Sequence, residues 1–197
     1  MTRFSSFINA ATFCFAATAG SASDNALYAE AAPADASFVR FVGFQGATSA
    51  TYAGRSFDLR PNEAEAYIPI SAAHLSGVDA GTFVTVIRQP NGVETPIEEA
   101  DRSNKAKVFL FLVNATDQML DLRLADGSMT VIEDVAGFAA GERAVNPVKI
   151  GLGVFPDGSD TPLAVFDVSM KRGQNLSFVA DDSGVRLIEH RFGAVAK

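Results

Sequence analysis

Apolar residues in this chain recur in short runs separated by polar turns, a pattern typical of β-strands. Val108 to Val113 is a continuous run of β-branched or bulky residues, too short to cross a membrane as a helix, and it predicts a buried strand. Leu120 to Leu124 alternates apolar and charged positions, which predicts a strand with one solvated face. Asp126-Gly127 then supplies hairpin-turn chemistry, and Met129 to Val135 can return antiparallel.

The first half of the chain follows the same rule. Phe38 to Phe44 is rich in aromatic residues and valine, which predicts a strand buried on both faces. Ala53-Gly54 is flanked by two short strand-like segments, Thr48 to Tyr52 and Arg55 to Leu59. Asn91-Gly92 is a further hairpin signal. No segment has a helical period over more than two turns, so the predicted class is all-β.

Turn signals at spacings of about 8 to 12 residues are typical of β-sandwiches. A polar stretch beginning at Glu98 separates two β-rich halves, each with a buried strand, a short loop, a second strand and a glycine turn. This shared order favours an internal duplication, and unrelated halves remain the alternative. We expect two tandem β-sandwich domains, residues 24–97 and 107–197, joined by a linker at 98–106. In the second domain, the glycine- and alanine-rich residues after Val135 predict a loop as far as Glu142-Arg143.

The first 23 residues have the features of a secretory signal peptide. Arg3 precedes an apolar segment, and small residues follow it, so cleavage is expected after Ala22 or Ser23. Cys14 is the one cysteine of the chain and lies inside this segment, so the mature protein is expected to have no disulfide. Because no later run reaches 18 apolar residues, we expect no membrane insertion and a periplasmic location.

The charge balance is acidic, with 16 Lys and Arg against 23 Asp and Glu and a net charge of −7. An acidic chain is a poor match for nucleic acid, so no nucleic-acid partner is expected. The local positive residues are Arg102, Lys105, Lys107, Arg143 and Lys149. They are either solvated linker and strand positions or a contact for a partner protein or a polyanion.

Candidate catalytic chemistry is sparse. His74 and His190 are the two histidines, and His190 lies between Glu189 and Arg191, which predicts a solvated side chain. The sequence has no metal-ligand spacing around His74, no Gly-x-Ser-x-Gly elbow and no phosphate-binding glycine loop. We therefore predict no catalytic, cofactor-binding or metal-binding residue. The remaining enzymatic alternative is an acetyl carrier or esterase that uses Ser128 or Ser159 with His190.

The order and spacing of several short motifs resemble those of the alginate biosynthesis protein AlgF family. These motifs are Ala26-Leu27-Tyr28, Pro33, Ser37-Phe38-Val39-Arg40, Asn104-Lys105, Asn114, Ala125-Asp126-Gly127 and Asn146-Pro147-Val148-Lys149. The resemblance covers nearly the whole mature chain. It is strongest from Asn104 to Phe155 and weak from Thr48 to Gly81.

The resemblance implies a periplasmic accessory protein that is required for O-acetylation of alginate or a similar uronate polysaccharide. In that family the two β-sandwich domains are taken to form an adaptor without catalytic residues, which links the membrane acetyl-transfer machinery to periplasmic acetyltransferases. The alternative is a carbohydrate-binding module that holds the polymer directly. Such modules usually present exposed aromatic rings, whereas this chain has no Trp, and its 16 Phe lie mostly in strands expected to be buried.

Overall fold

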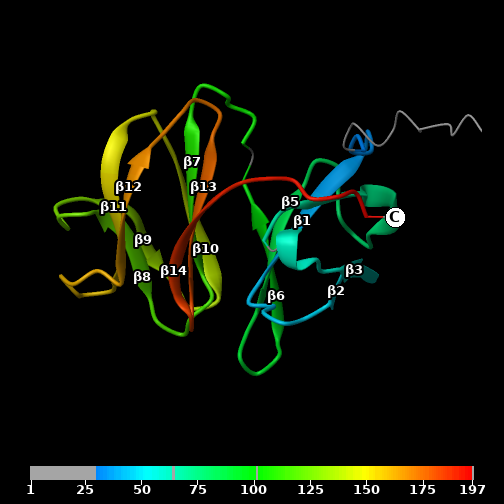
Figure 1. Cartoon of the computed structure of the whole chain (residues 1–197), viewed down its shortest axis with the longest axis horizontal. Coiled ribbons are helices and arrows are strands. Elements are labelled where there is room, and N and C mark those ends of the chain that lie inside the picture. Colours follow the sequence, from blue (N-terminus) through cyan, green and yellow to red (C-terminus); the bar gives the residue numbers. More distant parts are fainter. Residues whose placement is uncertain (1–29, 64, 101, 197) are drawn as a thin grey trace, which may run out of the picture.

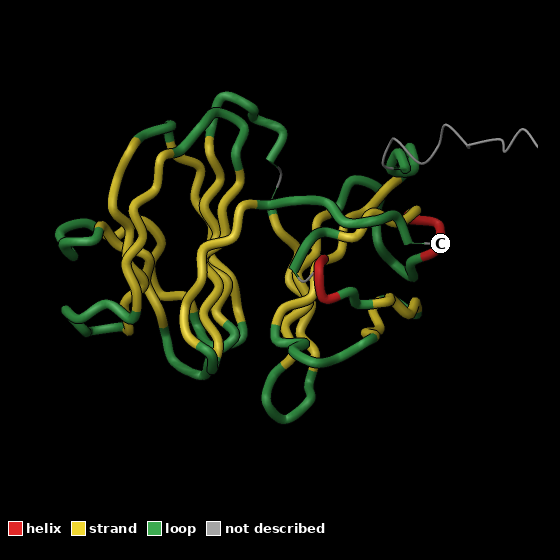
Figure 2. Tube along the Cα trace, viewed as in Figure 1, coloured by secondary structure: helices red, strands yellow, loops and turns green. Residues whose placement is uncertain are grey.

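The protein is a stack of four β-layers. The computed structural model describes residues 30–63, 65–100 and 102–196, so the predicted signal peptide and the motif Ala26-Leu27-Tyr28 lie outside the described residues. Two layers belong to the first half of the chain and two to the second (Figures 1 and 2). The predicted all-β class is confirmed.

The first half forms one four-stranded sheet and one hairpin. The four-stranded sheet has the order β4-β1-β5-β6, in which β1 is antiparallel to β4 and parallel to β5. The hairpin β2-β3 turns at Ala53-Gly54, where both residues have positive φ. The strands are β1 (Ala36–Val42), β2 (Ser49–Tyr52), β3 (Arg55–Asp58), β4 (Ile68–Ser71), β5 (Phe83–Arg88) and β6 (Glu94–Glu99), with short 3-10 turns at η2 (Pro61–Glu63) and η3 (Ala72–His74).

The second half forms two four-stranded sheets, with the orders β10-β7-β13-β14 and β12-β11-β8-β9. In the first of these sheets β7 is antiparallel to β10 and parallel to β13. The strands are β7 (Val108–Asn114), β8 (Leu120–Leu124), β9 (Thr130–Val135), β10 (Ala139–Val145), β11 (Lys149–Pro156), β12 (Ala164–Ser169), β13 (Asn175–Asp181) and β14 (Gly184–Glu189).

The two halves share one connectivity. Strands β1 to β4 pair as β7 to β10 do, and β5 and β6 pair as β13 and β14 do, including the parallel contact at the centre of each main sheet. Strands β11 and β12 have no counterpart among the described residues of the first half. This agreement supports the predicted duplication and shows that the second domain carries two additional strands.

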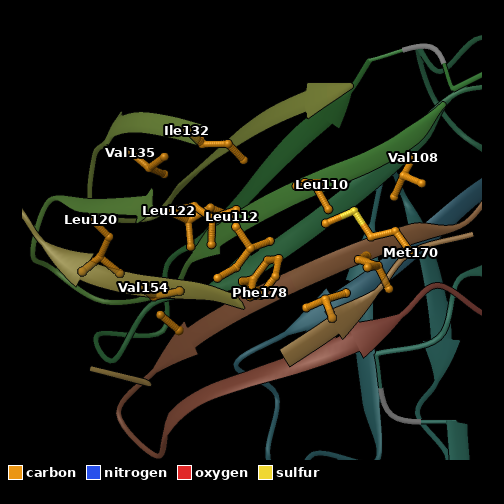
Figure 3. Packing of buried hydrophobic residues seen from close by; sticks show 14 residues of the cluster. Val108, Leu110, Leu112, Leu120, Leu122, Ile132, Val135, Val154, Met170 and Phe178 are labelled. Carbon is orange, nitrogen blue, oxygen red and sulfur yellow. The ribbon is translucent and has the colours of Figure 1, made fainter. Parts of the chain in front are cut away.

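Each sandwich has its own apolar core, because alternate side chains along each strand point inward. In the second domain Leu110, Leu112, Leu122 and Phe178 are at most 1% exposed and pack between the two sheets (Figure 3). In the first domain the corresponding core includes Phe41 and Phe57. Burial of one such large side chain contributes about 1.5–3 kcal/mol.

A third apolar cluster joins the two domains. Val42 and Ile87 from the first domain pack with Phe111, Val113 and Val179 from the second, and all five are at most 1% exposed. These residues lie on the outward faces of the two main sheets, which therefore pack against each other as the two middle layers (Figure 2). The domains bury both faces of their central strands, which explains the uninterrupted apolar runs in the sequence.

Two sequence predictions are wrong at the level of single elements. The glycine- and alanine-rich stretch expected to be a loop forms β10, which pairs with β7 along its whole length. Gly141 explains the composition, because a Cβ there would lie 2.5 Å from Ile132 Cγ2 and 2.8 Å from Val135 Cγ2. In addition, Glu98 and Glu99, assigned to the linker, are the last residues of β6.

The last residues of the chain return to the first domain. Tyr67 N donates to Arg191 O at 2.9 Å, Gly193 N donates to Tyr67 O at 2.8 Å, and Ala196 N donates to Pro69 O at 2.9 Å. The segment thus runs parallel beside β4, with a bridge between Tyr67 and Phe192. Within the described residues there is no helix long and apolar enough to span a bilayer.

Candidate functional site

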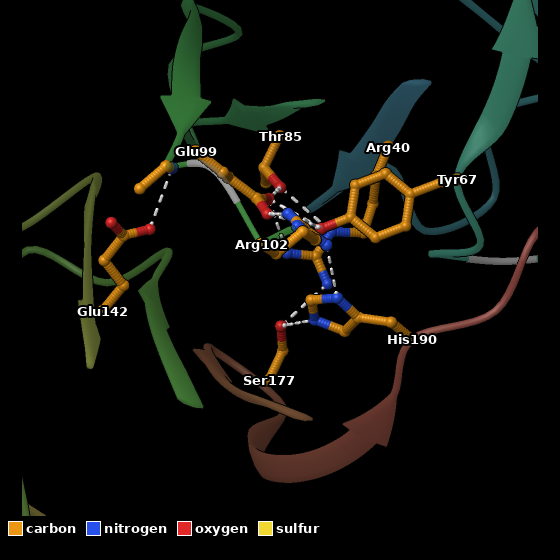
Figure 4. Close-up of polar contacts among 9 residues, drawn as sticks. Arg40, Tyr67, Thr85, Glu99, Arg102, Glu142, Ser177 and His190 are labelled. Carbon is orange, nitrogen blue, oxygen red and sulfur yellow. Dashed lines mark hydrogen bonds and ion pairs between the residues drawn. The ribbon is translucent and has the colours of Figure 1, made fainter. Parts of the chain in front are cut away.

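A buried polar network lies at the junction of the two domains (Figure 4). Its members come from both halves of the chain and sit beside the apolar cluster that joins the main sheets. They are Arg40, Tyr67, Thr85, Glu99, Arg102, Ser177 and His190. Four of them, Arg40, Tyr67, Thr85 and Ser177, are fully buried.

Arg40 is the centre of this network. It lies in the middle of β1, and its Nε donates to Thr85 Oγ1 at 2.9 Å on the neighbouring strand. Its Nη1 donates to Ser177 Oγ at 2.9 Å in the second domain, and its Nη2 donates to Glu99 Oε1 at 3.0 Å. A buried guanidinium is tolerated only when its donors are paired, and here all three nitrogens have partners.

Glu99 supplies the negative charge of the network. Its carboxylate accepts hydrogen bonds from Tyr67 at 2.7 and 2.8 Å, and from Thr85 and Arg102. Burial alone raises the pKa of Glu99, but the charges of Arg40 and Arg102 and these hydrogen bonds outweigh it and hold the pKa below its usual value. Burial raises the pKa of Tyr67 far above its usual value, so its hydroxyl remains a donor to Glu99.

The guanidinium of Arg102 gives the network one excess positive charge, because Arg40 and Arg102 face a single carboxylate. Aromatic rings surround this guanidinium, whose carbon lies 4.0 Å from the Phe83 ring centroid, 4.8 Å from that of Phe111 and 5.1 Å from that of Tyr67. The negative faces of such rings attract a desolvated cation. Aromatic packing therefore offsets part of the charge that Glu99 does not neutralise.

His190 lies in this network, so the prediction of a solvated side chain is wrong. Its Nδ1 accepts a hydrogen bond from Arg102 Nη1 at 2.8 Å. The proton of the neutral ring is then on Nε2, which donates to Ser177 Oγ at 2.6 Å. Burial, together with the charges of Arg40 and Arg102, lowers the pKa of His190 to about 2, which keeps the ring neutral.

This arrangement differs from a catalytic Ser-His pair in two respects. A general base needs an unprotonated nitrogen toward the hydroxyl, whereas His190 presents N–H to Ser177. Ser177 Oγ also accepts from Arg40 and is fully buried, so a substrate has no path to it in this conformation. The pair lies within the second domain and contacts the first domain through Arg40, and it has no geometry for proton abstraction.

The serines suggested as nucleophiles from the sequence are not near His190. Ser128 Oγ donates to Asp126 at 2.6 Å within the β8-β9 turn, and Ser159 Oγ donates to Thr161 O at 3.2 Å in the loop after β11. Both are turn contacts. Among the described residues, neither serine contacts His190, and the predicted turn role of Asp126-Gly127 fits the positive φ of Gly127.

A second set of polar contacts joins the domains at the rim. Arg186 on β14 forms a two-point contact with Glu65, with its Nε 3.0 Å from Oε2, and its Nη1 is 2.7 Å from Asp181 Oδ2. Hydrogen bonding to Glu65, opposed by burial, raises the pKa of Arg186 above its usual value. Gln45 Nε2 donates to Asp181 Oδ2 at 2.9 Å, again between domains. The junction is therefore closed by an apolar cluster, a buried network and a polar rim.

A pocket of about 420 Å³ opens beside this rim. Its walls include the apolar side chains of Phe41, Phe44 and Ile68, and this volume is within the range of small-ligand sites. Its two arginines, Arg60 and Arg186, form ion pairs with neighbouring carboxylates. Each arginine of the described lining therefore already has a carboxylate partner, although the Arg60–Glu63 pair is exposed.

Three of the five basic residues singled out in the sequence lie at one end of the second domain. Lys105 and Lys149 are exposed, and Lys107 is half-buried with its Nζ 2.8 Å from Asn146 Oδ1. The β12-β13 turn adds two exposed cations that the sequence reasoning missed, Lys171 and Arg172. We call this set the basic end: Lys105, Lys107, Lys149, Lys171 and Arg172.

Backbone hydrogen bonds hold the segments of the basic end together. Gly173 N donates to Lys107 O at 2.9 Å, and Met170 N donates to Val148 O at 3.1 Å. The three segments consequently meet at the upper end of the second domain in Figure 1. Val148 is 47% exposed between them, so the surface combines positive charge with an apolar side chain.

The other two predicted residues lie elsewhere. Arg102 is 6% exposed and belongs to the buried network, so it is not part of a contact surface in this conformation. Arg143 is exposed on β10, with its Nη1 3.2 Å from Val131 O.

The sequence gives a weak sign of the network, since Arg40 and Ser177 interrupt apolar strand runs, but their partners come from distant segments. Among the described residues no cluster of His, Cys, Asp and Glu could hold a metal ion.

These features define a two-domain β-sandwich protein whose domains are fixed to each other by a buried junction. The family model described as "Alginate O-acetyl transferase AlgF" matches residues 10–177, and the chain belongs to this family. The alginate biosynthesis protein AlgF of Pseudomonas putida is 29% identical over 82% of this chain and 80% of its own length. That of Pseudomonas fluorescens is 30% identical over 83% of this chain and 80% of its own length.

A solved structure of the C-terminal domain of AlgF from Pseudomonas aeruginosa is also similar, with 25% identity. The match covers 44% of this chain and 98% of that domain, with a TM-score of 0.37. At this TM-score the structural match adds nothing to the description of the fold. Family membership rests on the sequence comparisons, and they agree with the resemblance found in the motifs.

Proposed function

We propose that this protein is a non-catalytic periplasmic adaptor required for O-acetylation of alginate or a similar uronate exopolysaccharide. It would link the membrane acetyl-transfer machinery to the periplasmic acetyltransferases that modify the polymer. Family membership supports a role in alginate acetylation. The predicted signal peptide supports export to the periplasm.

The main support for the adaptor role is the tautomer of His190 together with the burial of Ser177. The family description names an O-acetyl transferase, and this pair is the Ser-His contact that the described residues offer. Because His190 directs N–H toward a buried Ser177, the pair supports a structural role in this chain rather than nucleophilic catalysis. A fixed two-domain body with the basic end exposed suits a protein that positions partners.

The test is deletion of the gene, followed by measurement of the acetyl content of the secreted polymer. We expect acetylation to be lost and to return when the gene is supplied on a plasmid. Purified protein should release no acetate from an activated acetyl ester, and the variant Ser177→Ala should restore acetylation in the deletion strain. Unchanged acetyl content after deletion would refute the proposed role, and acetate release that requires Ser177 would refute the non-catalytic part.

The basic end also favours a second candidate function, a module that binds the polymer directly. Lys105, Lys149 and Lys171 are exposed cations in an acidic protein, and a polyuronate is an anion. Titration of the labelled protein with uronate oligomers separates the two roles. NMR shift changes clustered at the basic end would favour polymer binding, whereas no change at millimolar oligomer would favour contact with proteins.

A further inference from the structure

The shared connectivity of the two domains identifies an edge that is covered in one domain and open in the other. In the second domain β8 pairs with β9 on one side and with β11 on the other. In the first domain β2 holds the position of β8 and pairs only with β3 among the described residues. The outer edge of β2 therefore corresponds to the edge that β11 occupies.

The hydrogen-bonding groups of this edge can be assigned from the hairpin register. Leu59 N donates to Thr48 O at 2.9 Å, so Thr48, Ala50 and Tyr52 direct their backbone groups toward β3. Because these directions alternate along an antiparallel strand, Ser49 and Thr51 direct theirs toward the outer edge. Both residues are exposed, and neither forms a backbone hydrogen bond with another described residue on that side.

One acceptor at the end of this edge is already used. Ala53 O accepts from Ser76 N at 2.9 Å, whereas at the matching hairpin of the second domain Ala125 N donates to Gly151 O of β11 at 3.0 Å. The loop near Ser76 thus closes the edge beside the turn. The groups of Ser49 and Thr51 remain open, which is enough for a short extended segment.

The sequence of β2 also lacks the devices that usually protect an edge strand. Proteins commonly prevent strand addition with charged residues or proline on exposed edges. Among the described strands at sheet edges, β3, β4, β6, β9, β10, β12 and β14 each contain a charged residue or a proline. Strand β2, with the sequence Ser-Ala-Thr-Tyr, contains neither. Edge β4 is in addition covered by the C-terminal segment.

We infer that the outer edge of β2 binds an extended segment of a partner protein by strand addition. Main-chain hydrogen bonds to Ser49 and Thr51 would provide the binding, as β11 provides them to β8. The segment would place small apolar side chains beside Ala50 and Tyr52 and polar side chains beside the hydroxyls of Ser49 and Thr51. This inference rests on the proposed adaptor function, for which it supplies a second contact surface, distant in the chain from the basic end.

The test uses two substitutions of the same residue in the full-length protein. Thr51→Pro removes the outward N–H donor without removing a bond to β3, since proline is tolerated where the N–H faces solvent. Thr51→Val removes the hydroxyl and keeps the donor. In the deletion strain we expect Thr51→Pro to leave polymer acetylation at the level of the deletion and Thr51→Val to restore the wild-type level.

Wild-type acetylation with a folded Thr51→Pro protein would overturn the inference, while loss of acetylation on gene deletion would leave the proposed function standing. If Thr51→Pro fails to fold, Ser49→Pro replaces it.

Hydrogen exchange of the wild-type protein gives a separate readout. The protein is placed in a detergent extract of cell envelopes that acetylate the polymer, and separately in an extract from cells lacking the acetylation genes. We expect the amides of Ser49 and Thr51 to exchange at least tenfold more slowly in the first extract. Unchanged exchange, or a Thr51→Pro effect limited to the dissociation of a self-dimer, would also overturn the inference.

Discussion

Arg40 and Ser177 lie 137 positions apart in the sequence, and Arg40 Nη1 donates to Ser177 Oγ at 2.9 Å across the domain junction. Both side chains are fully buried, so this contact can form only when the two main sheets are packed together. The bond would be lost if the domains moved apart, and the guanidinium would then lose a partner in a poorly solvated position. The domains are therefore expected to unfold as one cooperative unit.

Glu99→Gln should strongly destabilise the protein. The substitution removes the single negative charge that faces Arg40 and Arg102, and breaking such a buried ion pair costs about 3–5 kcal/mol. Glu98→Gln on the same strand is the matched control, because Glu98 is exposed and its substitution should change stability by less than about 0.5 kcal/mol. Urea unfolding curves measure both. Equal midpoints for the two variants would show that the network contributes little to stability.

His190 should make the protein less stable in mild acid. Its pKa is about 2 in the folded state, against about 6.5 in an unfolded chain, so the unfolded state binds a proton that the folded state excludes. The contribution of the neutral ring to the free energy of unfolding is therefore complete above pH 6.5. It decreases as the pH falls toward 2, by up to about 1.4 kcal/mol per pH unit.

The pH effect is measured by urea unfolding at pH 7.5 and pH 5. Glu99 titrates below this range because its pKa is lowered from 4.5, so it does not obscure the result. His190→Gln, which can still accept from Arg102 and donate to Ser177, should remove most of the difference between the two pH values. His74→Gln, at an exposed position, should retain it. A pH difference that survives in His190→Gln would exclude this histidine as its source.

Gly141→Ala should destabilise the second domain although alanine is a small residue. The new Cβ would lie within 3 Å of Ile132 and Val135 side chains, and forcing atoms into a packed core typically costs about 1–3 kcal/mol. Ala144→Ser at an exposed position of the same strand is the control and should have little effect. Thermal unfolding of both variants checks this. If the melting temperature of Gly141→Ala equals that of the wild type, β10 can move away from β9 without a loss of stability, and the prediction is wrong.

Charge reversal at the basic end should reduce polymer acetylation without unfolding the protein. The double variant Lys149→Glu with Lys171→Glu changes two exposed cations, and a partner with an acidic surface should bind it at least tenfold more weakly. The double variant Arg55→Glu with Arg60→Glu makes the same charge change in the first domain and is the control. Acetyl content of polymer from complemented deletion strains is the measurement. An equal effect of both doubles would indicate a response to net charge rather than to this surface.

Much of the fold was accessible from the sequence because strand periodicity and turn chemistry are local properties. Leu120 to Leu124 forms β8, and the run from Val108 forms β7, as predicted. The exception, β10, has the composition of a loop because Gly141 must fit closely against Ile132 and Val135. Close packing between layers therefore overrode local propensity at that strand.

The junction could not be predicted in the same way. The polar sequence neighbours of Arg102 and His190 predict solvent-facing side chains. Glu99 is only three positions from Arg102, but Arg102 and His190 lie 88 positions apart, and the pairing of such distant segments has no local signal. A charged residue within an apolar strand, such as Arg40, was the available sign that a buried partner was needed.

The C-terminal segment beside β4 also has a consequence for how the protein is made. Tyr67 and Pro69 receive their outer hydrogen-bond partners from Arg191, Gly193 and Ala196, the last described residues of the chain. The first domain to leave the ribosome or the export channel is thus completed by residues that follow the whole second domain. Contacts of such long sequence separation form late and slowly. Until then β4 is an uncovered edge, and chains that stop before Arg191 would keep that edge open throughout their lifetime.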